Sequence, residues 1–199
     1  MVERRRTKRL IFMALFLLLA ALMTFYRLLP LGGYGIDATL SEEERLVAFE
    51  ASSLWEQMGV PDLLLCLTMA WVLRRPDLLP APLIAGYFLL EDILLLRPPG
   101  LWAMMVLLGS EFLRRHAAQF RSYRFFSEFL LVAGLFVAMW LANRAVLAIV
   151  MVPLPALGLS FVHLLGTIAA YPVMVAISRF VFGLRKPATG ELDALGQKL

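Results

Sequence analysis

The sequence contains one cysteine, little charge and none of the short motifs that mark common catalytic sites. Cys66 lies within an apolar run, so it predicts neither a disulfide nor a cysteine metal site. No H-x-x-x-H, C-x-x-C, Walker loop, D-x-x-D array or Asp-Gly-x-x-Ala-Arg signature is present. Hydrolase, metalloenzyme, ATPase and phospholipid-transferase functions therefore have no support, and we expect no enzyme activity, no cofactor and no metal.

Charge is scarce because most of the chain is apolar. Only 17% of the 199 residues are charged, 61% are hydrophobic, and the mean hydropathy is +0.78. This composition is far more apolar than a soluble core of this length requires. The sequence predicts an integral membrane protein, with no room for a soluble domain and no nucleic-acid partner.

Apolar runs predict an all-α polytopic bundle of six transmembrane helices, because a helix needs about 20 apolar residues to cross a bilayer. The first run ends without a small-x-small cleavage pattern, which favours an uncleaved signal anchor. The loop at 32–59 is acidic, and its second half has the pattern of an amphipathic surface helix. We expect spans at about residues 10–31, 60–73, 79–96, 101–113, 129–152 and 158–182.

The basic residues decide whether the short second and fourth runs really cross, since short cytoplasmic loops collect Lys and Arg. With six crossings and the N-terminus inside, 15 of the 19 Lys and Arg residues fall on the inner side. Fewer crossings would move basic clusters outside. We therefore expect a basic cytoplasmic N-terminus at 1–9, a cytoplasmic loop at 114–126, a periplasmic loop at 32–59 and a cytoplasmic tail at 184–199.

Two adjacent carboxylates, Glu91 and Asp92, interrupt the third apolar run. Insertion of a carboxylate at the centre of a span costs roughly 3 kcal/mol of free energy. Such a residue is therefore expected where a partner group pairs with it or where it reaches the water interface. Arg144 in the fifth span is expected at a similar depth. We predict an Asp92–Arg144 ion pair across the bundle, with Glu91 reaching headgroups or a partner protein. The alternative is that both acids extend to the outer interface.

The remaining polar residues have structural explanations. Asp62 follows Pro61 at a span entrance, where an acid suits the helix dipole, and Glu111 is spaced to pair with a neighbouring arginine. Ser160 and His163 share a helix face without a nucleophile elbow, so helix packing is favoured over catalysis. A basic and aromatic segment after the fourth span suits anionic lipid or a cytoplasmic partner, with contacts from Arg114, Arg115, Arg121 and Arg124.

The order and spacing of several of these residues resemble the bacterial rod shape-determining protein MreD family. The resemblance rests on Pro61-Asp62-Leu-Leu-Leu, Leu90-Glu-Asp-Ile-Leu-Leu, Arg97-Pro-Pro-Gly-Leu-Trp102 and the closing run from Pro172 to Lys186. The family's third-span aspartate maps to Asp92 and its turn glycine to Gly100. Glu91 and the acidic loop at 32–59 have no family role that we can assign.

The resemblance implies a non-catalytic subunit of the cell-elongation machinery in the bacterial inner membrane. Such a subunit binds the bitopic protein MreC, and it works with MreB, RodA and the elongation-specific penicillin-binding protein to direct lateral-wall peptidoglycan synthesis and cell shape. The family is also thought to share the six-helix fold of the S components of vitamin transporters. The alternative function is therefore that of a substrate-binding subunit of a small-molecule transporter.

Overall fold

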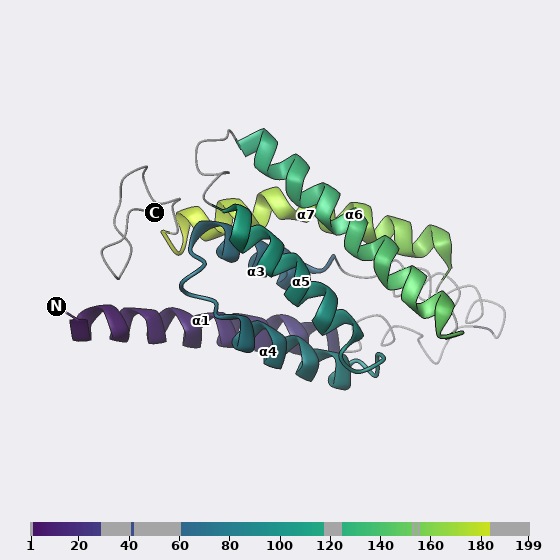
Figure 1. Cartoon of the computed structure of the whole chain (residues 1–199), viewed down its shortest axis with the longest axis horizontal. Helices are drawn as coiled ribbons and strands as arrows, with labels where there is room; N and C mark the ends of the chain where they lie inside the picture. Colours follow the sequence, from purple (N-terminus) through teal and green to yellow (C-terminus); the bar gives the residue numbers. More distant parts are fainter. Residues whose placement is uncertain are drawn as a thin grey trace.

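The computed structural model describes residues 2–28, 41, 61–117, 125–152, 154 and 156–183. Consecutive helices run in opposite directions along the long axis, so α1 begins at the end of the molecule where α7 finishes (Figure 1). The described residues are all-α, as predicted, and form six helices: α1 (Val2–Leu28), α3 (Leu63–Arg74), α4 (Ala81–Leu94), α5 (Leu101–His116), α6 (Phe125–Ile149) and α7 (Leu157–Phe180).

The two ends of the bundle differ in charge. At the end where α3, α5 and α7 finish, their last turns carry arginines, and we call it the basic end. The other end, where α4 turns into α5 and α6 finishes, we call the hairpin end (Figure 1). Arginines in the last turn of a helix complement the partial negative charge of its C-terminus.

Helix α3 forms the centre of the bundle. Asp62 caps its start, since Asp62 Oδ1 accepts a hydrogen bond of 3.0 Å from the Leu65 amide. Every residue from Leu64 to Leu73 is buried, and α3 packs against α7, α5 and α1. A helix that is apolar all round has no solvent face to offer. Arg75 ends α3 because Pro76 follows and disfavours helical backbone.

Helix α1 packs on α3 along one stripe. Phe16, Ala20 and Thr24, four residues apart, are buried, whereas most of the large apolar residues between them are exposed. The rings of Phe12 and Phe16 lie 6.2 and 5.7 Å from the ring of Trp71 at the core of α3. The stripe leaves the rest of α1 facing outward, which suits a helix surrounded by hydrocarbon.

Helices α4 and α5 form an antiparallel hairpin. Pro82 lies in the first turn of α4, where a missing amide hydrogen costs little. Gly100 starts α5 with φ +86°, a left-handed conformation that favours glycine. Asp92 Oδ2 accepts hydrogen bonds of 3.1 Å from the amides of Gly100 and Ala103. The aspartate of α4 thereby satisfies the free amides at the start of α5.

Helices α6 and α7 form a second hairpin, and together with α1 they are long and apolar enough to cross a membrane. Gly109 of α5 allows α6 to approach closely, because a Cβ added there would lie 2.9 Å from Met139 Sδ. Exposed large apolar residues cover α1, α6 and α7, including Leu18 (67%), Leu130 (54%) and Leu165 (50%). Extensive apolar exposure of this kind is unusual for a soluble monomer and indicates a multi-pass membrane protein.

The helix boundaries correct the predicted ones in two places. α1 begins at Val2, so the basic segment predicted at 1–9 is largely a continuation of the first helix. α5 runs to His116 and α6 begins at Phe125, so both ends of the loop predicted at 114–126 are helical. The predicted acidic loop at 32–59, apart from Ser41, and the tail at 184–199 lie outside the described residues.

Candidate functional site

Two buried carboxylates and a partly buried arginine meet at the hairpin end, from the start of α3, the last turn of α4 and the end of α1. Arg27 Nη1 lies 2.9 Å from Glu91 Oε1 and 3.7 Å from Asp62 Oδ1. The carboxylate side chains are 0 and 2% exposed, and the arginine side chain is 15% exposed. We call these three residues the Arg27 cluster. One guanidinium between two carboxylates compensates for the loss of water around the buried charges.

The hydrogen bonds of the Arg27 cluster are incomplete. Glu91 Oε2 and, on the next residue, Asp92 Oδ1 are buried and have no hydrogen-bond partner among the described residues. Within the described residues, Arg27 makes its hydrogen bond and ion pairs with Nη1 alone. Its Nε and Nη2 therefore donate to no described residue. The cluster therefore keeps both donors and acceptors unused.

The predicted Asp92–Arg144 ion pair does not form, and this prediction was wrong. One carboxylate oxygen of Asp92 bonds the amides that start α5, and the other has no partner. Arg144 Nη1 instead donates to Ser160 Oγ at 3.2 Å, and its guanidinium lies 5.5 Å from the ring centroid of Trp140. The physical reason is that α4 packs on α5, whereas α6 packs on α5 and α7.

Glu91 is the ion-pairing acid of the two, and its predicted contact with headgroups was also wrong. Glu91 and Asp92 are 1 and 0% exposed, which excludes the alternative that both extend to the interface. Both point into the bundle because the buried face of α4 also carries Ile84 and Phe88. Sequence reasoning missed Arg27 as the partner because it lies 64 residues before Glu91, beyond any helical spacing.

Pro61 and Asp62 serve the packing of α3 on α7. Asp62 lies at the entrance of α3, where the sequence predicted an acid that suits the helix dipole, and the structure shows that it caps the helix. Its amide donates to Thr167 Oγ1 at 3.1 Å. Pro61 packs closely on Gly166 of α7, because a Cβ added at Gly166 would lie only 3.4 Å from Pro61 Cγ. These contacts hold the start of α3 against α7 and thereby position Asp62 beside Arg27.

A second buried cluster lies toward the basic end and joins α3, α6 and α7. Arg74 Nη1 lies 2.9 Å from Glu128 Oε1, and the same oxygen accepts a hydrogen bond of 2.9 Å from Tyr171 Oη. Arg74 also donates to the Ala70 carbonyl at 3.2 Å. We call Arg74, Glu128 and Tyr171 the Arg74 cluster. The sequence analysis did not predict this cluster, although Glu128, an acid near the start of a predicted span, indicated that a partner was needed.

The basic residues predicted to contact lipid divide into two groups. Arg114 turns inward: it pairs with Glu111 at 2.9 Å, which confirms the predicted pair, and donates to the carbonyls of Pro76 and Leu79 at 2.5 and 2.6 Å. These contacts tie the α3–α4 connection to α5, and the predicted contact of Arg114 with lipid or a partner stays a prediction. Arg115 is exposed, and Arg121 and Arg124 lie outside the described residues.

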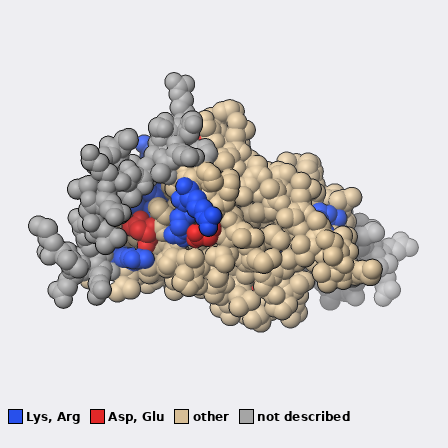
Figure 2. All heavy atoms as spheres, viewed as in Figure 1, with Lys and Arg blue, Asp and Glu red and all other residues tan. Residues whose placement is uncertain are grey.

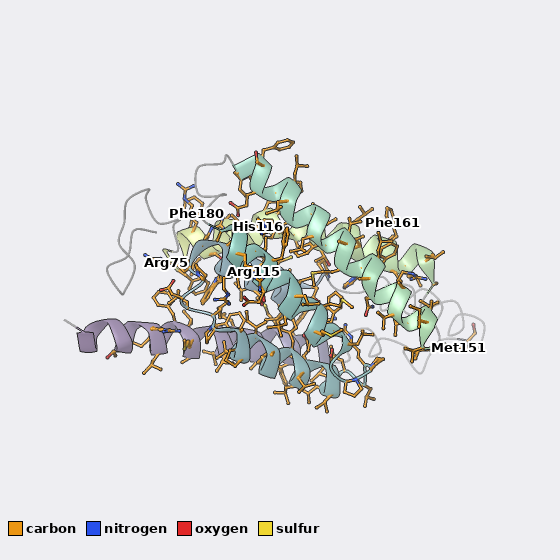
Figure 3. All side chains as sticks on the ribbon, viewed as in Figure 1. Arg75, Arg115, His116, Met151, Phe161 and Phe180 are labelled. Carbon is orange, nitrogen blue, oxygen red and sulfur yellow. The ribbon has the colours of Figure 1, made fainter. Side chains whose placement is uncertain are left out.

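The exposed part of the basic end remains a charged surface. Arg75, Arg115 and His116 all lie toward this end of the molecule, and Arg115 is the exposed one of the three (Figure 3). On the face seen in Figure 2, most charged side chains of the described residues lie toward the end where α1 begins, with one small basic spot near the opposite end. This distribution is typical of a membrane protein with one basic boundary.

A cavity of about 440 Å³ lies beside the Arg27 cluster, between the second half of α1 and the start of α3. Among the described residues that line it, Arg27 is the only charged one. The described lining residues are Leu22, Met23, Phe25, Tyr26, Arg27, Pro61, Leu63 and Leu64. The volume falls within the roughly 300 to 1,000 Å³ that is usual for small-ligand pockets.

Within the described residues, no three His, Cys, Asp or Glu side chains are placed to hold a metal ion. Cys66 is buried, and its Sγ donates to the Thr167 carbonyl at 3.2 Å. Ser160 donates to the Ala156 carbonyl, and the His163 carbonyl accepts from Thr167, which are ordinary contacts within a helix. The chemistry that the Arg27 cluster offers is thus charge pairing and hydrogen bonding beside an apolar cavity.

Comparisons of the chain with protein-family models, with curated proteins and with solved structures found no match.

Proposed function

We propose that the chain is a non-catalytic, multi-pass subunit of the cell-elongation complex in the bacterial inner membrane. In this proposal it binds an MreC-type bitopic protein and acts with RodA, the elongation-specific penicillin-binding protein and MreB to direct lateral-wall synthesis. One observation carries it. Three positions of the MreD resemblance, the acids Asp62 and Asp92 and the turn glycine Gly100, all form defined contacts at one end of the bundle.

The contacts support the resemblance because they give each of these residues a physical role. Asp62 caps the central helix and faces Arg27, whereas Asp92 caps α5 through Gly100. Gly100 has the positive φ that a turn glycine needs. A chance match between two apolar sequences would not be expected to gather its few polar positions in one packed hairpin end.

Six crossings with both termini inside fit the alternating helix directions and the basic end (Figure 1). α3, α4 and α5 have 12, 14 and 16 residues, about 18 to 24 Å at 1.5 Å per residue, which is shorter than a hydrocarbon core of about 30 Å. α3 has no need to match the bilayer, because its neighbours bury it on every side. Positive charge at the basic end favours a cytoplasmic position for that end.

The role of a docking subunit fits the surfaces of the bundle. α1, α6 and α7 expose long apolar faces, on which the membrane helix of a bitopic partner can pack. At the cytoplasmic side, Arg115 is exposed and available to anionic lipid or to a filament-associated partner. The predicted periplasmic loop at 32–59 would meet the periplasmic base of the partner.

The alternative, an S-component-like subunit that binds a vitamin, has one supporting observation, the 440 Å³ cavity. Sites for small polar ligands place several convergent polar groups around the ligand. Here the described lining is apolar except for Arg27 and the Tyr26 hydroxyl. The cavity therefore supports a vitamin site less well than it supports an apolar occupant.

Depletion of this chain from its host, followed by microscopy and affinity purification from detergent, tests the proposal. We expect rod-shaped cells to round up, and a bitopic partner with a periplasmic domain to co-purify in fixed stoichiometry. Re-expression of the wild-type chain is the control and must restore rods. Normal shape combined with vitamin-dependent growth would reject the proposal in favour of the transporter subunit.

A further inference from the structure

The cavity beside Arg27 opens toward the outside of the bundle. Leu22, Phe25 and Tyr26 line it, yet they are 62, 60 and 48% exposed, so α1 does not close it off. The opposite wall consists of residues from the start of α3, including the buried Leu64. For a helix that crosses a membrane, the surroundings at this position are lipid. An occupant with an apolar body can therefore enter sideways from the bilayer.

Arg27 gives the cavity a polar end. It lies in the last turn of α1, one residue before the helix finishes at Leu28, where a span meets the headgroup region. Its Nη1 is held by Glu91, whereas Nε and Nη2 have no acceptor among the described residues. Guanidinium donors in fixed geometry match the oxygens of a phosphate or an ester. A ligand that fits this cavity therefore has hydrogen-bond acceptor atoms at one end and an apolar body.

The charges around Arg27 restrict the net charge of the occupant. Asp62 and Glu91 lie within 4 Å of its guanidinium, and Asp92 and Arg97 also act electrostatically on Glu91. Among the described residues, three carboxyl groups and two guanidiniums thus lie in or beside the cluster, so its acidic groups outnumber its basic groups by one. A headgroup with net negative charge would add to this excess, whereas a zwitterion brings its own cation. The unpartnered oxygen of Glu91 adds to the negative potential that a cation would meet.

We infer that this cavity is a binding site for one zwitterionic diacyl phospholipid, held with an acyl chain between α1 and α3 and its phosphate or ester oxygens against Arg27. The site lies at the end opposite the basic end, so it takes lipid from the outer leaflet in the six-crossing topology. Its support is the open apolar cavity, the unused donors and the charge balance, none of which depends on membership of an elongation complex.

Native mass spectrometry of the full chain in detergent tests the site, with phosphatidylethanolamine and phosphatidylglycerol added as equimolar probes. We expect one phosphatidylethanolamine to be retained at detergent concentrations that remove other lipid, in preference to phosphatidylglycerol. Leu22→Trp fills the cavity from an exposed position and should lower retention roughly tenfold, the loss that corresponds to about 1.4 kcal/mol. Leu18→Trp is the matched control, because Leu18 lies one turn away, is 67% exposed and does not line the cavity.

Arg27→Lys separates the headgroup contact from the cavity. Lysine keeps the charge that faces Glu91 but removes the planar set of donors, so retention should fall while the fold persists. Equal retention by the Leu22→Trp and Leu18→Trp variants would overturn the site, since it would mean that lipid binds all around the bundle. Tighter retention of phosphatidylglycerol would overturn the assignment to a zwitterion, and co-purification of a water-soluble molecule in place of lipid would overturn both.

Discussion

The two buried ion clusters differ in how completely their polar atoms are used. In the Arg74 cluster one guanidinium faces one carboxylate, and a tyrosine hydroxyl donates to the same oxygen. In the Arg27 cluster one guanidinium faces two carboxylates, one carboxylate oxygen has no partner, and a cavity adjoins the arginine. Among the described residues, the first cluster pairs one acid with one base, whereas the second has more acidic than basic groups and has unused donors.

The difference separates a structural role from a functional one. A buried ion pair with additional hydrogen bonds holds helices in a defined arrangement, because removal of either charged member leaves the other charge without compensation. A network with unused polar atoms costs stability unless something else contacts it. We therefore assign the joining of α3, α6 and α7 to the Arg74 cluster, and contact with a molecule outside the chain to the Arg27 cluster.

Glu128→Leu should have the largest effect on stability. It leaves the Arg74 guanidinium, whose side chain is 6% exposed, without its carboxylate, and removal of one partner from a buried pair costs about 3 to 5 kcal/mol. The measurement is thermal unfolding of the purified chain in detergent, together with its level in membranes. A stability unchanged within error would show that the Arg74 cluster does not hold the bundle together.

The double variant Arg74→Met with Glu128→Leu is the control for that prediction. Replacement of both charges by apolar side chains removes the uncompensated guanidinium, so most of the lost stability should return. If the double variant is as unstable as Glu128→Leu alone, the loss comes from other contacts of Glu128, such as the one with the Tyr171 hydroxyl, and not from its ion pair with Arg74.

Asp92→Ala should have an intermediate effect, although this aspartate lies beside the Arg27 cluster. It removes the acceptor of two amides at the start of α5, and loss of such a cap costs about 0.5 to 2 kcal/mol. The same unfolding assay measures it. Asp92→Asn keeps an acceptor oxygen and should retain most of the stability. An equal loss in both variants would contradict the capping role.

Glu91→Gln should change stability least and lipid preference most. The amide oxygen can still accept from Arg27, and Asp62 remains to balance the guanidinium, so we expect a change of about 1 kcal/mol or less. Because the variant removes the excess negative charge, the ratio of phosphatidylglycerol to phosphatidylethanolamine retained should rise. Glu111→Gln, at the partly exposed pair with Arg114, is the control and should leave this ratio unchanged.

Sequence patterns predicted the helices well and the ion pairs poorly. Apolar runs bounded by proline, glycine and arginine placed all six described helices within a few residues, apart from the start of α1, the end of α5 and the start of α6. Local caps were also predictable, because Asp62 and Leu65 are three residues apart. The pairing of Glu91 with Arg27 was not predictable, because it depends on which helices become neighbours, and no spacing along one helix encodes that.

The amino-acid sequence by itself determined that the chain is all-α and belongs in a membrane, because hydropathy and helix-breaking residues act locally along the chain. It also determined that the acids of α4 needed a partner, because a carboxylate in an apolar run is costly wherever it lies. Only the tertiary structure decided that Arg27 receives Glu91, that Asp92 caps α5 and that a cavity opens beside them. These outcomes depend on packing between segments far apart in the sequence, which sets the distances over which charges and hydrogen bonds act.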